Sequence, residues 1–123
     1  MTIQECYQQL GGDFAQVEKR LSSASLVRKF IAKFLDDESF SELCLAMKEG
    51  QREKAFRAAH TLKGVSASLS LTRLLSSASQ LAELLRAEEE TIPAGANLLF
   101  EEVKKDYGLT VRAIRTYLGA DPR

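Results

Sequence analysis

The single histidine of the sequence, His60, lies in a short cluster of residues whose types could support group-transfer chemistry. Lys63 and Gly64 follow it by three and four residues, so all three lie on one side if the segment is helical. A neutral imidazole near pH 7 has a free lone pair and could act as a base, a metal ligand or a nucleophile. An ammonium group one turn away would offset the negative charge of a phosphoryl group on the ring.

The residues around His60 favour one of these chemistries over the other two. A general base needs an orienting partner, but no Asp or Glu lies three or four residues away on either side. Metal binding needs more donors, and the two cysteines, Cys6 and Cys44, do not form an ordinary zinc site with one histidine. Nucleophilic use of the imidazole remains, beside the simplest interpretation, which is a surface histidine without function.

A helix that carries these residues is predicted over about 52–69, and it has two distinct faces. Small and apolar residues form the face expected to lie in the core: Ala55, Ala58, Ala59, Leu62, Val65, Ser66 and Leu69. A second face, centred about 140° away, contains Phe56, His60, Lys63, Gly64 and Ala67. A large aromatic ring and a helix-weakening glycine are unusual on a solvated face, so we expect a second protein to dock there.

The remaining sequence predicts an all-α fold that positions this helix. Leu and Ala number 33, the β-branched residues number 15, and no proline occurs before Pro93, which favours helix over strand. Apolar residues recur at helical spacing in short N-terminal helices within about 2–35 and in helices at about 38–49, 71–87 and 92–118. Pro93 fits the first turn of the last helix. The pattern favours an antiparallel up-and-down four-helix bundle with short N-terminal helices, formed by one domain over 1–123.

Composition and charge exclude several classes of protein. Lys and Arg together number 17, as do Asp and Glu, and this balance argues against nucleic-acid binding. The longest apolar run has five residues, whereas a membrane span needs about 20. The start of the chain has no secretory pattern, so we expect a cytoplasmic protein with buried, reduced thiols. Packing within one bundle buries nearly all of the apolar helix faces, which predicts a monomer. The run Glu88–Glu90 is expected to be a solvated helix end or turn.

The string His60-Thr61-Leu62-Lys63-Gly64 resembles the HxLKG signature of histidine-containing phosphotransfer (HPt) domains. The longer segment AFRAAHTLKGVSASLSLTRL is similar to their central helix, the turn after it and the start of the next helix, and the likeness covers most of the chain. The resemblance implies an antiparallel four-helix bundle in which His60 accepts a phosphoryl group and passes it on. The resemblance also implies that Lys63 stabilises the charge of the phosphoryl group and that Gly64 gives a partner access to His60. From the helical wheel, we extend this docking surface to Phe56 and Ala67.

The resemblance further implies a phosphorelay intermediate of two-component signalling. Its partners would be response-regulator receiver domains or a hybrid histidine kinase, and Mg²⁺ would be supplied by the receiver. The chain itself would need no cofactor or metal and would have no kinase or ATPase activity. One position departs from the family, because Ser70 stands where a glycine is frequent. The alternatives are a receiver-binding adaptor that never carries phosphate and a purely structural helical bundle.

Overall fold

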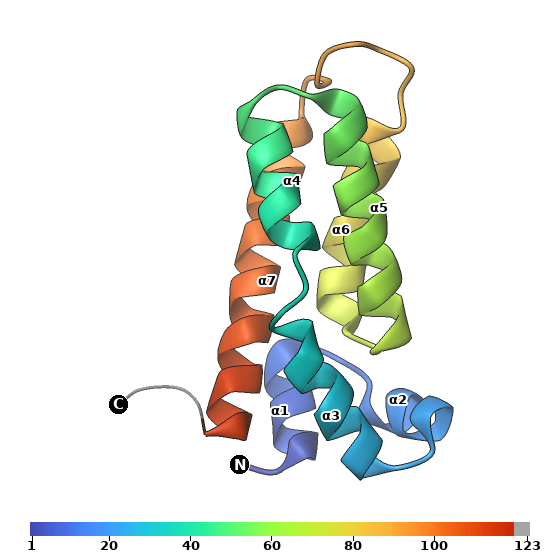
Figure 1. Ribbon diagram of the computed structural model, residues 1–123, viewed down its shortest axis with the longest axis vertical. Helices are drawn as coiled ribbons and strands as arrows, with labels where there is room; N and C mark the ends of the chain where they lie inside the picture. Colours follow the sequence, from blue (N-terminus) through green and yellow to red (C-terminus); the bar gives the residue numbers. More distant parts are fainter. Residues whose placement is uncertain (120–123) are drawn as a thin grey trace.

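The computed structural model describes residues 1–119, and seven α-helices account for most of that part of the chain (Figure 1). Their bounds are α1 (Ile3–Leu10), α2 (Phe14–Leu21), α3 (Ala24–Phe34), α4 (Ser39–Lys48), α5 (Arg52–Ser68), α6 (Thr72–Leu85) and α7 (Ala96–Leu118). No strand occurs among the described residues, which confirms the all-α prediction. Over the same residues, no helix has both the length and the apolar character needed to cross a bilayer.

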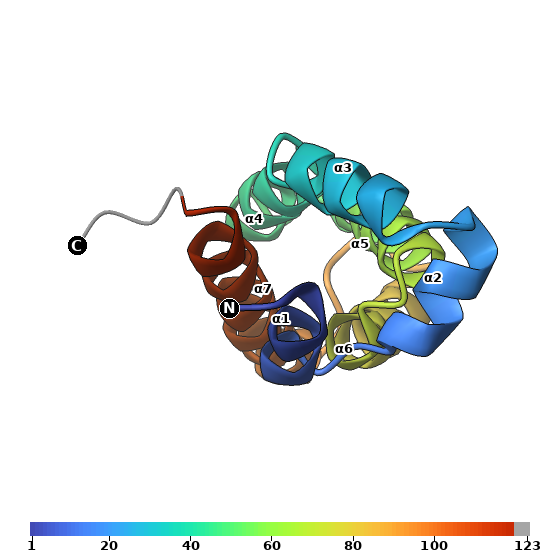
Figure 2. The ribbon, with the colours of Figure 1, turned by 90° about the horizontal axis from the view of Figure 1, so that it is seen from below.

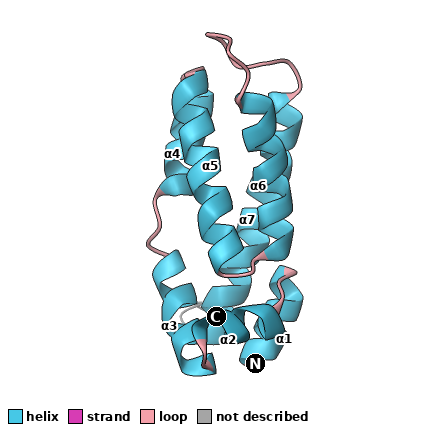
Figure 3. Cartoon of the chain, turned by 90° about the vertical axis from the view of Figure 1, so that its right-hand side faces the viewer, coloured by secondary structure: helices cyan, strands magenta, loops and turns pink. Residues whose placement is uncertain are grey.

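Helices α4 to α7 lie along the long axis of the molecule, and the three short helices lie at one end (Figures 1 and 3). The chain rises along α4, falls along α5, rises along α6 and falls along α7 in the view of Figure 1. Helix α5 packs against both α4 and α6, α6 packs against α7, and α1 packs against α7. The view along the axis shows these helices arranged around a common centre (Figure 2).

The buried apolar side chains form one cluster, and each of the seven helices contributes to it. Examples from α1 to α7 in order are Ile3, Val17, Val27, Leu43, Leu62, Leu74 and Ile114. On α5 the predicted core face is confirmed, except that Val65 is only partly buried. Because Ala55, Ala58 and Ala59 are small, α4 and α6 can approach the backbone of α5 closely on this face.

The last helix begins at Ala96, so the prediction of a helix from about residue 92 is wrong. Gly95 has a φ of 88°, in the left-handed region, and a right-handed helix cannot continue backward through it. Pro93 therefore lies in the connection, where its carbonyl accepts a hydrogen bond from the Ala96 N–H at 3.3 Å. A proline before a helix fits a first turn and a preceding loop equally well, and the sequence pattern does not separate the two.

Arg52 binds the other end of this connection, which follows α6. Helix α6 ends at Leu85, two residues before the predicted end at about 87. Its Nη1 donates to the Leu85 carbonyl at 2.6 Å, and its Nε donates to the Glu89 carbonyl. The first bond satisfies a carbonyl that the end of α6 leaves without an intrahelical partner, and the second attaches the connection itself to the start of α5. The acidic run Glu88–Glu90 is exposed in this connection, as expected for a solvated turn.

Ser70 has a φ of 53°, so it adopts the left-handed backbone for which glycine is the usual residue. Its hydroxyl donates to Oε1 of Gln16 at 2.7 Å and accepts a hydrogen bond from Arg20 Nη1 at 3.3 Å. The same Arg20 nitrogen donates to the carbonyls of Ala67 and Ser68 at 2.8 Å each. Arg20 of α2 therefore caps the C-terminus of α5. The hydrogen bonds of the Ser70 side chain offset the free-energy cost of its left-handed backbone.

We expect Ser70→Ala to lower the free energy of unfolding by about 1–2 kcal/mol, because it removes the hydroxyl bonds and keeps the left-handed backbone. Ser70→Gly removes the same bonds but relaxes the backbone, so its loss should be smaller by about 1 kcal/mol. Urea unfolding of the two variants in parallel measures the difference. Equal losses would show that the left-handed conformation has no cost here.

The thiol of Cys6 is fully buried and donates a hydrogen bond to the Ala113 carbonyl at 3.5 Å, whereas Cys44 is only partly buried. Burial raises the pKa of the Cys6 thiol from 9.0 to about 11. The folded state therefore retains a proton that the unfolded state loses above pH 9, so this contribution to stability is complete below pH 9 and disappears as pH rises toward 11.

The midpoint of urea unfolding should accordingly fall between pH 9 and pH 11. Burial also raises the pKa of the neighbouring Tyr7 hydroxyl, so Cys6→Ala should reduce this fall without removing it. Unfolding curves of the wild type and Cys6→Ala at pH 8 and pH 10.5 measure both effects. A fall of the same size in the variant would contradict the assignment to Cys6.

Candidate functional site

His60 lies near the middle of α5 with an exposed side chain. The buried neighbours Ala59 and Leu62 direct one side of α5 into the core, so His60 must point outward. Its imidazole lies beside the ring of Phe56, one turn earlier, with 5.8 Å between ring centres and 29° between ring planes. Across residues 1–119, no hydrogen bond or ion pair holds this imidazole. Within the described residues, both ring nitrogens are therefore free of hydrogen-bond partners.

Lys63 follows one turn later on the same helix, with its side chain partly buried. Its ammonium forms no ion pair with any acidic residue in the described part of the chain. An unpaired cation close to an exposed imidazole is suited to stabilising an anionic group attached to that ring. The structure thus brings together the two residues that the spacing placed on one side.

Gly64 is exposed and helical, and neither its backbone nor its surroundings require a glycine. Its φ lies outside the left-handed region, and a Cβ added there would meet no atom of the described residues within 4 Å. Gly108 in α7 has the same properties. A glycine inside a helix costs about 1 kcal/mol relative to alanine, so Gly64 weakens α5 without any benefit to packing within the chain. Its effect is to leave free space beside His60.

Phe56 and Ala67 belong to the face of α5 that the helical pattern predicted for docking, and the structure shows both of them partly buried. The structure adds Arg86, at the end of α6, whose guanidinium carbon lies 5.3 Å from the centre of the Phe56 ring. Sequence reasoning missed Arg86, because it lies 26 residues after His60 and outside the HxLKG string. Only the packing of α5 against α6 places it at the site.

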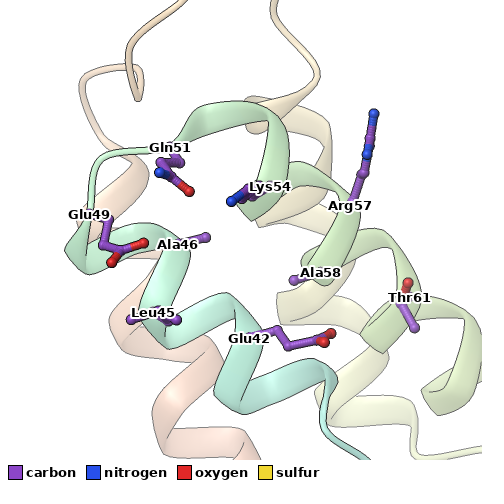
Figure 4. A pocket seen from close by; sticks show the side chains of 9 residues that line it. All are labelled: Glu42, Leu45, Ala46, Glu49, Gln51, Lys54, Arg57, Ala58 and Thr61. Atoms are coloured by element: carbon purple, nitrogen blue, oxygen red, sulfur yellow. The ribbon is translucent and has the colours of Figure 1, made fainter.

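A groove lies between α4 and α5 (Figure 4). It has a volume of about 280 Å³ and is lined by Glu42, Leu45, Ala46, Glu49, Gln51, Lys54, Arg57, Ala58 and Thr61. Leu45 is 55% exposed at this groove, which is unusual for a large apolar side chain. Thr61 directly follows His60, so the groove adjoins the face that carries the histidine.

The described residues contain no group of three or more His, Cys, Asp and Glu side chains that could hold a metal ion. The site offers one exposed imidazole, one ammonium without an ion pair among the described residues, and free space at Gly64. These features are suited to a helical protein whose surface histidine meets a group brought by a partner.

The family model described as "Hpt domain" matches residues 25–113, which is most of the chain. The chain belongs to the Hpt domain family, as the HxLKG string indicated, and this family serves histidine phosphotransfer in the phosphorelays of two-component signalling. The matched range extends from α3 into α7 and includes all of α5. Comparison with curated proteins and with solved structures finds no match.

Proposed function

We propose that this chain is a phosphorelay intermediate in which His60 carries a phosphoryl group from one receiver domain to another. The observation that supports this most is the combination of an exposed, unbonded His60 with Gly64, a glycine that the chain does not need for its own structure. A partner that must bring a phosphorylated side chain to within bonding distance of the imidazole needs that space.

The transfer itself is a displacement at phosphorus. A lone pair of the neutral imidazole attacks the phosphorus of a receiver's aspartyl phosphate, so that a P–N bond forms. The P–O bond to the aspartate breaks, and its electron pair leaves with the carboxylate. In the second step the carboxylate of another receiver attacks the same phosphorus and the P–N bond breaks. The chain ends each cycle unchanged, as a stoichiometric carrier.

The other site residues would assist the transfer without forming a bond to phosphorus. The Lys63 ammonium would offset the negative charge of the phosphoryl oxygens, which are the main target of stabilisation in such transfers. Phe56 and Ala67 would belong to the surface on which the receiver docks, and Gly64 would allow its close approach. The receiver would supply the Mg²⁺ ion and the acidic residues.

We further propose that α4, α5, α6 and α7 form the antiparallel four-helix bundle expected for HPt proteins, within one domain over 1–123. The alternating course of these helices and their single buried cluster support this arrangement. We also propose a monomer in the cytoplasm. A relay carrier must bind successive partners through the same face, and a dimer that covered His60 would prevent this.

The test is phosphoryl transfer to the wild-type chain from a panel of phosphorylated receiver domains of the same cell. We expect label from at least one receiver that is stable in base and labile in acid, as for a phosphorus–nitrogen bond on histidine. Incubation with ATP alone should give no label, because the chain would have no kinase activity. Receiver binding without any label would favour the adaptor, and neither binding nor label would favour a structural bundle.

A further inference from the structure

Three side chains contact one another in series: Arg86 contacts Phe56, and Phe56 contacts His60. The guanidinium of Arg86, the C-cap residue of α6, lies over the ring of Phe56, 5.3 Å from its centre. The Phe56 ring lies beside the His60 ring at 5.8 Å, with the two planes only 29° apart. Both contacts have the geometry of attractive interactions, a cation over a ring face and an offset pair of aromatic rings.

Arg86 is itself held in place at the end of α6. It is the C-cap residue of that helix, and its backbone N–H donates to the Glu83 carbonyl at 3.3 Å. Its Nε also forms an ion pair with Oε2 of Glu83 at 3.3 Å. Both partners of this ion pair are exposed, so it favours the position of the guanidinium near Phe56 only modestly, and it does so from outside α5.

His60 has no comparable tether of its own. Among the described residues its ring has neither a hydrogen bond nor an ion pair, and Phe56 is its one aromatic contact. Exposed side chains change rotamer within picoseconds to nanoseconds. Displacement at phosphorus requires the attacking nitrogen to lie in line with the bond that breaks, so an imidazole held in one orientation reacts faster than a freely rotating one.

We propose that Arg86 is a positioning residue for phosphotransfer, because it holds the Phe56 ring in the place that orients the His60 imidazole. It acts through Phe56 and is not a catalytic residue. This inference rests on the proposed function of His60, and it adds the C-cap residue of α6 to a site that the sequence placed on α5 alone.

The first arm of the test is NMR on the unphosphorylated chain. Because the sequence has one histidine, the two carbon-bound ring protons of His60 can be assigned without a complete assignment. The ring current of Phe56 displaces these resonances, and Phe56→Leu gives their values without that ring. We expect Arg86→Gln to move them at least half of the way to the Phe56→Leu values, and Arg86→Lys, which keeps a cation, to move them much less.

Arg28 provides a matched control. Its guanidinium carbon also lies 5.3 Å from the centre of an aromatic ring, that of Tyr117, and it lies on α3. Arg28→Gln should remove a contact of the same kind and length without moving the His60 resonances. Unchanged His60 resonances in Arg86→Gln, or an equal displacement in Arg28→Gln, would overturn the proposal.

The second arm measures the rate of transfer from a receiver that labels the wild type. Arg86→Gln should slow the transfer about 3- to 10-fold, since modest misplacement of reacting groups has effects of this order or greater. In the Phe56→Leu background the same substitution should change the transfer rate less than about 1.5-fold, because both variants remove the same interaction. A ratio of ~1 between the two rates would mean that Arg86 acts entirely through Phe56. Arg28→Gln should change the rate less than twofold.

Equal slowing by Arg86→Gln in both backgrounds would overturn the proposal, because it would show that Arg86 acts on the phosphoryl group without Phe56. The proposed function fails by a different result, either no label on the wild type from any receiver or persistent label on His60→Gln. In that case the NMR arm still decides whether Arg86 orders the imidazole. The two failures are therefore distinguishable.

Discussion

Replacing His60 with Gln is expected to abolish acceptance of phosphoryl groups and to leave the fold intact. The glutamine amide has no nucleophilic lone pair on nitrogen, so the initial rate of label transfer should fall by about 10³-fold or more, as when an enzyme loses its nucleophile. The His60 side chain is exposed and unbonded within the described residues, and the free energy of unfolding should change by less than about 0.5 kcal/mol. Transfer from a phosphorylated receiver and urea unfolding measure the two quantities.

Receiver binding by the same variant separates the two main interpretations. Transfer and binding are different steps, so His60→Gln should still bind a receiver that labels the wild type. Label on the variant at the wild-type rate would contradict the assignment of His60. The adaptor alternative predicts a different pattern, in which binding and signalling survive the substitution and the wild type is never labelled.

Substitution of Gly64 is expected to have opposite effects on stability and on transfer. Gly64→Ala should raise the free energy of unfolding by about 0.5–1 kcal/mol, because a Cβ meets nothing within 4 Å and alanine favours helix. A larger side chain in Gly64→Gln should lower the transfer rate by about 10²-fold, since it occupies the space through which the receiver must approach. Urea unfolding and transfer kinetics on the same preparations test both effects.

Gly108 is the matched control for this prediction, because it is also an exposed helical glycine with free space around it. Gly108→Ala should stabilise the chain by a similar amount, about 0.5–1 kcal/mol. Gly108→Gln should leave the transfer rate unchanged, because α7 does not carry the reactive face. Wild-type transfer by Gly64→Gln, or equal slowing by both glutamine variants, would contradict a specific role for Gly64.

The helical periodicity of the sequence was sufficient to predict the face of α5 that carries the site. Residues three and four apart lie on one side of any α-helix, so His60, Lys63 and Gly64 could be placed together without a structure. The inward direction of Ala55, Ala59 and Leu62 followed from the same periodicity. These features depend on local geometry alone, and the structure confirms them.

The features that the sequence did not predict depend on tertiary packing or on backbone conformation. Arg86 reaches the site because α6 packs on α5, and no spacing within either helix indicates that contact. The start of α7 depends on the left-handed Gly95, whereas Pro93 by itself is compatible with a start two or three residues earlier. Ser70 keeps a backbone conformation typical of glycine through hydrogen bonds to α2, a helix 50 residues away in the sequence.

The hydrogen bonds from Arg20 to the end of α5 also affect how the segment that matches the family could be moved into another protein. Arg20 lies before residue 25, where the match to the family begins, yet it closes the helix that carries His60. A transplanted copy of residues 25–113 would leave the Ala67 and Ser68 carbonyls without this donor, so the C-terminus of α5 would depend on water there. Substitutions in the N-terminal helices provide a route by which evolution can adjust the histidine helix while the HxLKG string itself stays the same.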